Sequence, residues 1–198
     1  MPRKIVLAAL IGLSLAAIMA SSTFAIGLWV RPGTSDPERS GIVKALWAPN
    51  EGVADGRGDH PALLLGKNGP SVVNASAGAS LFGVAGLILY ELGWDVRDDG
   101  YCGETSPRFF VVTTDEVAHD IGCTSPSPTS KELVTDARGT DWKRLRYDPQ
   151  DASPPISRGS RVKLIGIIFD AGTDVGSGFV HLDNIEINGM AVSQAPHR

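Results

Sequence analysis

The sequence predicts an all-β protein: a two-sheet antiparallel β-sandwich of the jelly-roll kind, preceded by an N-terminal signal helix. Short segments rich in β-branched and aromatic residues alternate between apolar and polar positions, as strands with one face in a core do. Turn-forming residues are plentiful, with 23 glycines and 13 prolines. Helical spacing is not sustained after the N-terminal signal segment, so we expect the domain to consist of about eight to ten short strands.

Residues 1–25 have the three parts of a secretory signal peptide. Arg3 and Lys4 form a basic start, an uncharged apolar stretch follows over 5–20, and small residues lead to a cleavage site after Ala25. The alternative is a retained membrane anchor, because an uncharged stretch of about 20 residues can cross a bilayer. Either interpretation places the rest of the chain outside the cytoplasm, as a secreted protein or as one tethered by its uncleaved leader.

Three segments follow the leader. Residues 26–42 are polar and interrupted by proline and glycine, which predicts a flexible linker. Residues 43–192 carry the alternating segments and form the β-sandwich domain, whose length suits a single core. Residues 193–198 are expected to form a loose tail.

The longest alternating segment of the first half runs over 87–97. One of its faces is wholly apolar and the other becomes polar toward the end, so the apolar face, which includes Tyr90 and Trp94, is expected to face the core. Shorter strands are expected upstream of it, over 62–65, 72–73 and 79–84.

The second half contains further strand candidates. Residues 109–114 and 117–123 are separated by a polar turn and predict a hairpin. The segment 161–170 is rich in Val, Ile, Leu and Phe, as central strands are. Alternation also predicts strands over 142–147 and 179–188.

The two cysteines, Cys102 and Cys123, both lie in the part of the chain that would be exported. Two cysteines of one domain usually pair in an oxidising compartment, so we expect a structural disulfide at the open end of the hairpin. Closing a loop of roughly 20 residues would contribute about 3 kcal/mol by the chain-entropy estimate. A catalytic or metal-binding thiol pair is the alternative, but the spacing matches no recognised metal motif.

The charge balance excludes some partners. The formal net charge is −4, and it becomes more negative when Arg3 and Lys4 leave with the leader. A mildly acidic chain offers no electrostatic basis for binding nucleic acid or an anionic membrane. A membrane is therefore expected as a partner only if the leader is retained.

Several motifs carry a resemblance that covers most of residues 60–190. The runs 91–97, 102–103, 107–109, 122–123 and 178–185 resemble a group of uncharacterised secreted bacterial proteins. The closing run Leu182-Asp183-Asn184-Ile185 is also similar to the last strand of jelly-roll carbohydrate-binding modules of the galactose-binding-domain type. The first resemblance implies a compartment and a fold, but no activity.

The carbohydrate-binding resemblance implies two further expectations. In such modules an aspartate of the closing strand can hold a structural calcium ion, and the matching position is Asp183. Calcium is the sole cofactor suggested, and the rest of its ligand set is not visible in the sequence. The expected partner is a polysaccharide or cell-surface glycan.

Exposed aromatic rings are the natural platforms for a sugar, because a ring face packs against the apolar C–H face of a pyranose. Trp142 shares a strand face with two arginines, and Tyr101 lies in a glycine-rich turn beside the disulfide, so these two are the candidate ligand-binding residues. Trp94 and Trp47 are expected to pack in the core and against an edge strand instead.

No catalytic residue is assigned. His181, Asp183 and Ser177 can be drawn as a hydrolytic triad, but the G-x-S-x-G turn that would hold such a serine is missing, and partly exposed strand residues explain His181 and Asp183 better. The leading hypothesis is a secreted, non-catalytic binding or surface-interaction module, with carbohydrate as the first ligand class. The alternatives are a small secreted hydrolase and a structural envelope protein with no small ligand.

Overall fold

The computed structural model describes residues 27–54, 60–70, 74–170 and 178–194. Within these ranges the chain is built of strands, with one short 3-10 helix at Pro149–Asp151. The strands are β1 (Trp29–Ser35), β2 (Val43–Ala48), β3 (Ala62–Lys67), β4 (Ser76–Phe82), β5 (Leu92–Arg97), β6 (Arg108–Thr113), β7 (Ala118–Gly122), β8 (Ser130–Thr135), β9 (Asp141–Tyr147), β10 (Val162–Phe169), β11 (Gly178–Ile187), β12 (Met190–Ala191) and β13 (Ser193–Gln194).

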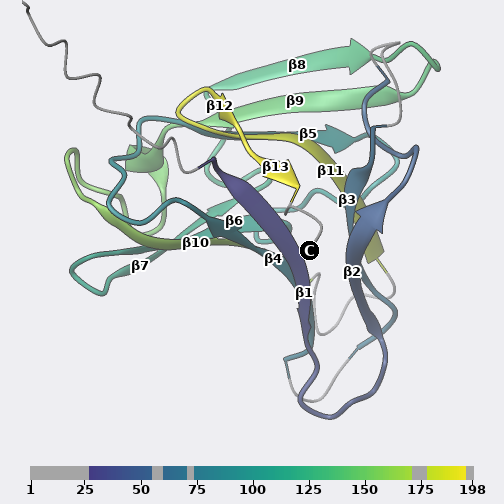
Figure 1. Ribbon diagram of the computed structural model, residues 1–198, viewed down its shortest axis with the longest axis horizontal. Helices are drawn as coiled ribbons and strands as arrows, with labels where there is room; N and C mark the ends of the chain where they lie inside the picture. The colour runs from purple at the N-terminus through teal and green to yellow at the C-terminus, as the bar shows by residue number, and fades with distance from the viewer. Residues whose placement is uncertain (1–26, 55–59, 71–73, 171–177, 195–198) are drawn as a thin grey trace, which may run out of the picture.

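The strands form two sheets that pack face to face (Figure 1). One sheet has the order β13-β1-β4-β10-β6-β7, and we call it the six-stranded sheet. The other has the order β2-β3-β11-β5-β9-β8, with β12 paired to β11, and we call it the seven-stranded sheet. Every pairing is antiparallel except that of β1 with β13. The predicted all-β antiparallel sandwich is therefore confirmed, whereas the predicted signal helix lies outside the described residues.

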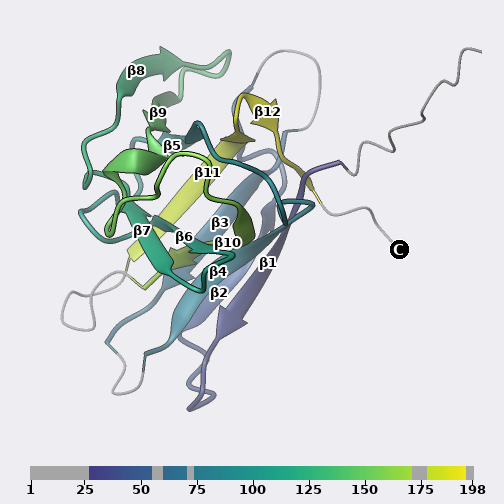
Figure 2. The same cartoon turned by 90° about the vertical axis from the view of Figure 1, so that its left-hand side faces the viewer.

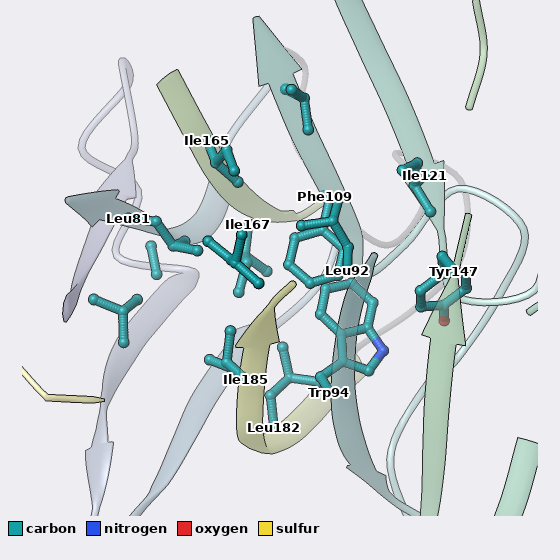
Figure 3. Close-up of a cluster of buried hydrophobic side chains, with 14 of the residues drawn as sticks. Leu81, Leu92, Trp94, Phe109, Ile121, Tyr147, Ile165, Ile167, Leu182 and Ile185 are labelled. Carbon is teal, nitrogen blue, oxygen red and sulfur yellow. The ribbon is translucent and has the colours of Figure 1, made fainter. Parts of the chain in front are cut away.

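The core lies between the two sheets and is centred on Trp94. Its ring stacks on Phe109 of the opposite sheet, with centroids 4.0 Å apart, and meets the ring edge of Tyr147 (Figure 3). Trp94 is fully buried, as the alternation of its strand predicted. Aliphatic residues from both sheets fill the space around these rings, among them Leu81, Leu92, Ile121, Ile165, Ile167, Leu182 and Ile185.

Most strands of the domain lie where the sequence predicted them. β6 and β7 form the predicted hairpin, and β10 is central, since β4 and β6 flank it. β3, β4, β9 and β11 match predicted segments within a few residues. The short strand predicted over 72–73 lies outside the described residues.

The strand predicted over 87–97 is shorter than expected. β5 begins at Leu92, because the side chain of Asn188 accepts hydrogen bonds from the N–H groups of Tyr90 and Glu91 and donates one to the carbonyl of Ile88. These bonds take the place of ladder pairing over this stretch. Tyr90 is consequently 71% exposed, so the prediction that it faces the core is wrong.

The segment predicted as a flexible linker, 26–42, contains β1. Val30 of this strand is fully buried, and β1 pairs with β4 along its whole length. Pro32 is tolerated because β13 pairs with β1 only as far as Val30, so the missing N–H of Pro32 falls on an unpaired edge. The linker prediction is thus wrong for β1, and β13 likewise occupies part of the predicted tail.

The two edge strands of the seven-stranded sheet differ in how much the rest of the protein covers them. β8 lies at the outer margin of the molecule in both views (Figures 1 and 2), and its residues are mostly exposed. β2 lies at the other edge and contacts β1 of the facing sheet. Among the described residues, no helix has the length and apolar character needed to cross a bilayer.

The predicted disulfide between Cys102 and Cys123 is present, and neither cysteine is free. It joins the end of β7 to the chain that precedes β6. Tyr147 donates a hydrogen bond of 3.0 Å to the carbonyl of Cys123, and burial raises the pKa of its hydroxyl. The disulfide is therefore anchored to β9 of the opposite sheet as well as to its own hairpin.

Candidate ligand-binding groove

The outer face of the six-stranded sheet carries an open hollow of about 650 Å³, which we call the groove. It extends over β1, β4 and β10 and reaches Phe110 of β6. On β4, alternation turns Ala77, Ala79 and Leu81 toward the core. The residues between them face the groove: Ser76, Gly78, Ser80 and Phe82.

The floor of the groove consists of residues with little or no side chain. The strand register pairs Gly78 with Gly33 of β1, and Ser80 with Gly166 of β10. A Cβ atom added at Gly33 would meet no atom within 4 Å, so this part of the floor faces open space. Three neighbouring strands thus expose mainly backbone where a sheet normally carries a layer of side chains.

Aromatic and aliphatic side chains form the margins of the groove. Phe82 is 38% exposed and stacks on Trp29, with ring centroids 3.8 Å apart and planes within 7°. Leu164 of β10 lies beside this pair and is 41% exposed. Phe110 lies on the far side of the floor, where it pairs with Gly166. The groove therefore offers apolar ring faces on two sides of a flat floor.

A second hollow of about 550 Å³, the polar hollow, continues this face across β6 and β7. Arg108 lines it and lies two residues from Phe110 on the same face of β6. The guanidinium of Arg108 donates to the carboxylates of Asp120, at 3.0 Å, and Asp170, at 2.8 Å. Because both carboxylates are partly exposed, the cluster has acceptors left for the hydroxyl groups of a ligand.

Trp142, a predicted platform residue, is fully buried in the structure. Trp142 lies on the outer face of β9, which it shares with Arg144 and Arg146 as predicted. However, the turn after β8 covers its ring. The indole N–H donates to Asp136 of that turn, at 3.4 Å. The ring is therefore not presented to solvent, and Trp142 does not line the groove.

Tyr101, the second predicted platform residue, is 39% exposed. Its ring meets the edge of Phe169, and its backbone N–H donates to the carbonyl of Phe179, at 2.8 Å. These contacts hold Tyr101 at the end of the sandwich, where it lines neither the groove nor the polar hollow. A role of Tyr101 in binding stays a prediction.

Asp183, the predicted calcium ligand, has a backbone-positioning role in the structure. Its carboxylate accepts from the N–H groups of Val53 and Asn184, both at 2.7 Å. Burial raises the pKa of Asp183, although these two bonds lower it. Within the described ranges, no three His, Cys, Asp or Glu side chains lie close enough together to hold a metal ion, and a calcium-binding role of Asp183 stays a prediction.

The structure gives little support to a hydrolytic triad that contains His181. His181 and Asp183 share the outer face of β11, as predicted, but no hydrogen bond joins His181 to an acid or a hydroxyl in the described part of the chain. The imidazole instead meets the ring of Phe179 edge-on, with centroids 5.6 Å apart. Ser177 lies outside the described residues.

The sequence pattern does not predict a binding role for the groove residues. Trp29 lies in the segment predicted as a linker, and Phe82 and Phe110 lie in segments predicted only as strands. The signal that points to them is the row of small residues between aromatic ones on alternate positions of adjacent strands. This signal is visible only when the pairing of β1, β4, β10 and β6 is known, because these strands are far apart in the sequence.

Neither a protein-family model nor a curated protein sequence matches the chain. Two solved structures are similar to it. One is a family 11 carbohydrate-binding module of a cellulosomal cellulase of Clostridium thermocellum, with 13% sequence identity, 85% of this chain and 91% of that chain covered, and a TM-score of 0.44. The other is a family 11 module of Clostridium thermocellum in complex with a β-1,3-1,4-mixed-linked tetrasaccharide, with the same identity and coverage and a TM-score of 0.47.

The similarity is distant. It agrees with the resemblance of the closing strand to carbohydrate-binding modules, and it carries no argument about the ligand or the site of this chain.

Proposed function

We propose that this chain is an exported, non-catalytic binding module that holds a polysaccharide along the outer face of the six-stranded sheet. The observation that carries the proposal is the floor of small residues in the groove, which lies between the exposed ring of Phe82 and the half-buried ring of Phe110. The expected leader supports the proposal, because a polysaccharide outside the cytoplasm is within reach of an exported protein.

The margins of the groove suit the apolar faces of sugar rings. A pyranose presents C–H groups on its ring faces, and an aromatic side chain packs against such a face while its edge remains in contact with water. Phe82 is held in place by its stack on Trp29, so little side-chain freedom is lost when a sugar lies against it. Phe110 provides a second such surface across the floor.

The polar hollow suits the equatorial hydroxyl groups. Arg108 donates hydrogen bonds, and the free lone pairs of Asp120 and Asp170 accept them. The ion pairs within this cluster hold the three side chains in a fixed arrangement before a ligand arrives. Charge-assisted hydrogen bonds of this kind are stronger than neutral ones and orient the ligand.

The extent of the face favours an oligosaccharide over a single sugar. From β1 to β7 it crosses five strands, which at a spacing of about 4.8 Å corresponds to roughly 19 Å. The groove and the polar hollow cover this distance without an intervening ridge of large side chains, apart from Phe110 and Ile168. A chain of several sugar units would contact both.

The proposal is tested by affinity electrophoresis of the purified protein in gels that contain soluble polysaccharides. We expect retardation by at least one neutral glucan or xylan. Phe82→Ala and Phe110→Ala should each weaken binding by about tenfold, because each removes a stacking surface. Tyr90→Ala is the control, since Tyr90 is an aromatic residue that lies outside the groove and is more exposed than Phe82.

A second pair of variants separates occupation of the groove from loss of stability. Gly33→Trp places a large side chain over the floor without a clash at its Cβ, whereas Gly27→Trp adds one at a position that is equally open but outside the groove. The first variant should abolish retardation and the second should leave it unchanged. Retardation that survives Gly33→Trp, or no retardation by any polysaccharide tested, would refute the proposal.

A further inference from the structure

We propose that the outer face of the seven-stranded sheet carries a second, separate site, which binds an uncharged ligand with an apolar ring and a hydroxyl group, such as a phenol. The site is a cavity of about 580 Å³ over β2, β3 and β11, which we call the apolar cavity. It lies on the opposite sheet from the groove and shares no lining residue with it. The inference does not depend on the function proposed for the groove.

The walls of the apolar cavity come from residues that face outward on β3 and β11. Leu64 and Gly66 alternate on β3 with residues that are buried on its core-facing side. A Cβ atom added at Gly66 would meet its nearest neighbours at 3.7 and 3.8 Å, which is ordinary contact, so this position leaves a low floor. Phe179 of β11 lies beside this floor and is 43% exposed. A ring can therefore lie over Gly66 and against Phe179.

The charges around the apolar cavity favour neither an anion nor a cation. Lys67 is 2% exposed and falls on the core-facing side of β3, so its ammonium does not face outward. Arg97 makes ion pairs with Asp99, at 2.7 Å, and with Glu51. Lys44 lies at the margin, where it is exposed to water. The two outward cations and the two acids balance, so this surface suits an uncharged ligand.

His181 provides the polar group of the apolar cavity. It lies on the outward face of β11 opposite Leu64, and it is 6% exposed. Its Nδ1 is closed to water and has no hydrogen-bond partner within the described ranges. Buried polar groups are normally hydrogen-bonded, because a group that loses water without gaining a partner is costly. A ligand hydroxyl that reaches Nδ1 would supply the missing hydrogen bond.

The protonation state of His181 favours a hydroxyl group over a carboxylate. Burial, and then Arg97, lower the pKa of His181, so its imidazole is neutral at pH 7. In a neutral imidazole one ring nitrogen donates a hydrogen bond and the other accepts one. A hydroxyl group can do either, so it pairs with Nδ1 in both tautomers of the ring.

The ring of Phe179 places a bound ligand next to the imidazole. The two rings meet edge-on, with centroids 5.6 Å apart. A ligand ring that packs against Phe179 is therefore within reach of His181, and a rotation of either side chain opens Nδ1 to the hydroxyl group. The volume of the apolar cavity lies in the range of small-molecule sites, about 300–1,000 Å³, which are mostly apolar with a few polar groups that orient the ligand. A sugar ring suits these walls less well, since most of its hydroxyl groups would face apolar surface.

The test is a titration of the isotopically labelled protein with para-cresol, toluene, para-toluate and methyl glucoside, followed by amide chemical shifts. We expect para-cresol to bind, with the largest changes at Gly66 and Phe179, and each of the other three compounds to bind at least about fivefold more weakly. Toluene tests the hydroxyl group, para-toluate tests the absence of a net positive charge, and methyl glucoside tests the apolar ring. No saturable binding of para-cresol, or equal binding of any of the other three, would overturn the proposal.

Variants locate the binding and identify the hydrogen bond. His181→Phe keeps a ring but lacks Nδ1, so it should weaken para-cresol binding about fivefold and leave toluene binding unchanged. Phe179→Ala removes a wall and should weaken the binding of both compounds. Gly33→Trp, which blocks the groove on the other sheet, is the matched control and should change neither.

Two outcomes keep the test decisive. If His181→Phe does not fold, as judged by its thermal transition, Phe179→Ala and the comparison of para-cresol with toluene decide. Para-cresol binding that is lost in Gly33→Trp but kept in Phe179→Ala would place the ring in the groove and refute a second site.

Discussion

Asp136 shows how one buried carboxylate covers a tryptophan that the sequence suggested would be exposed. It accepts hydrogen bonds from the backbone N–H groups of Thr140, Ala54 and Arg138 as well as from the indole of Trp142. Burial raises the pKa of Asp136, but these hydrogen bonds outweigh it and lower the pKa to about 2. The carboxylate therefore stabilises the folded chain in its ionised form.

This stabilisation predicts a pH-dependent effect of Asp136→Asn. The folded pKa lies below the unfolded value of 3.8, so the contribution is fully present above about pH 4 and is lost as the pH falls through about 2. We expect the variant to lower the free energy of unfolding by about 2 kcal/mol at pH 7 and by much less near pH 2. Urea denaturation at a series of pH values measures it.

The exposed Asp151 provides the control for this prediction. Asp151→Asn should change the free energy of unfolding by less than about 0.5 kcal/mol at each pH, since surface substitutions rarely do more. An Asp136→Asn penalty that stays constant down to pH 2 would show that the ionised carboxylate is not the stabilising species.

At the scale of elements, the strands with alternating apolar residues were predictable and those without them were not. β10 and β11 are recognisable because their β-branched residues face a core on one side. β1 contains a proline and a glycine and exposes most of its residues, so its local sequence resembles a linker. Its strand conformation depends on pairing with β4, which starts more than forty positions later, and no local pattern contains that information.

The assignment of β1 predicts that Val30→Ala is destabilising. Val30 is fully buried between the sheets, so the truncation should lower the free energy of unfolding by about 2 kcal/mol. Arg31→Ala, at the next and exposed position of the same strand, should change it by less than about 0.5 kcal/mol. Equal, small effects of both variants in urea denaturation would show that this segment behaves as the linker that the sequence suggested.

At the scale of the whole molecule, the sandwich separates two outer faces of different chemistry. The six-stranded sheet exposes small residues and aromatic rings, next to a cluster in which one arginine pairs with two aspartates. The seven-stranded sheet exposes a second cavity, which Leu64, Phe179 and His181 line. The fold class and the core position of Trp94 could be predicted from the alternation of apolar and polar residues. The disulfide could be predicted from the presence of two cysteines in one domain.

The groove could not be predicted, because it depends on which strands are neighbours. Gly33, Gly78 and Gly166 come from three distant segments, and each alone looks like an ordinary strand glycine. Trp142 illustrates the reverse case: its strand face was predictable, but the way in which the turn just before β9 folds back over its ring was not. Which strands are neighbours, and which side chains a turn covers, are decided only when the sheets assemble.

We propose that the outer face of the six-stranded sheet binds a polysaccharide. The most direct measurement is a map of amide chemical-shift changes in the isotopically labelled protein as an oligosaccharide from a retarding polysaccharide is added. We predict that the largest changes fall at Gly33, Gly78, Gly166 and Phe110, with smaller ones at Arg108. Changes confined to the seven-stranded sheet or to the loops at the ends of the sandwich would contradict the claim.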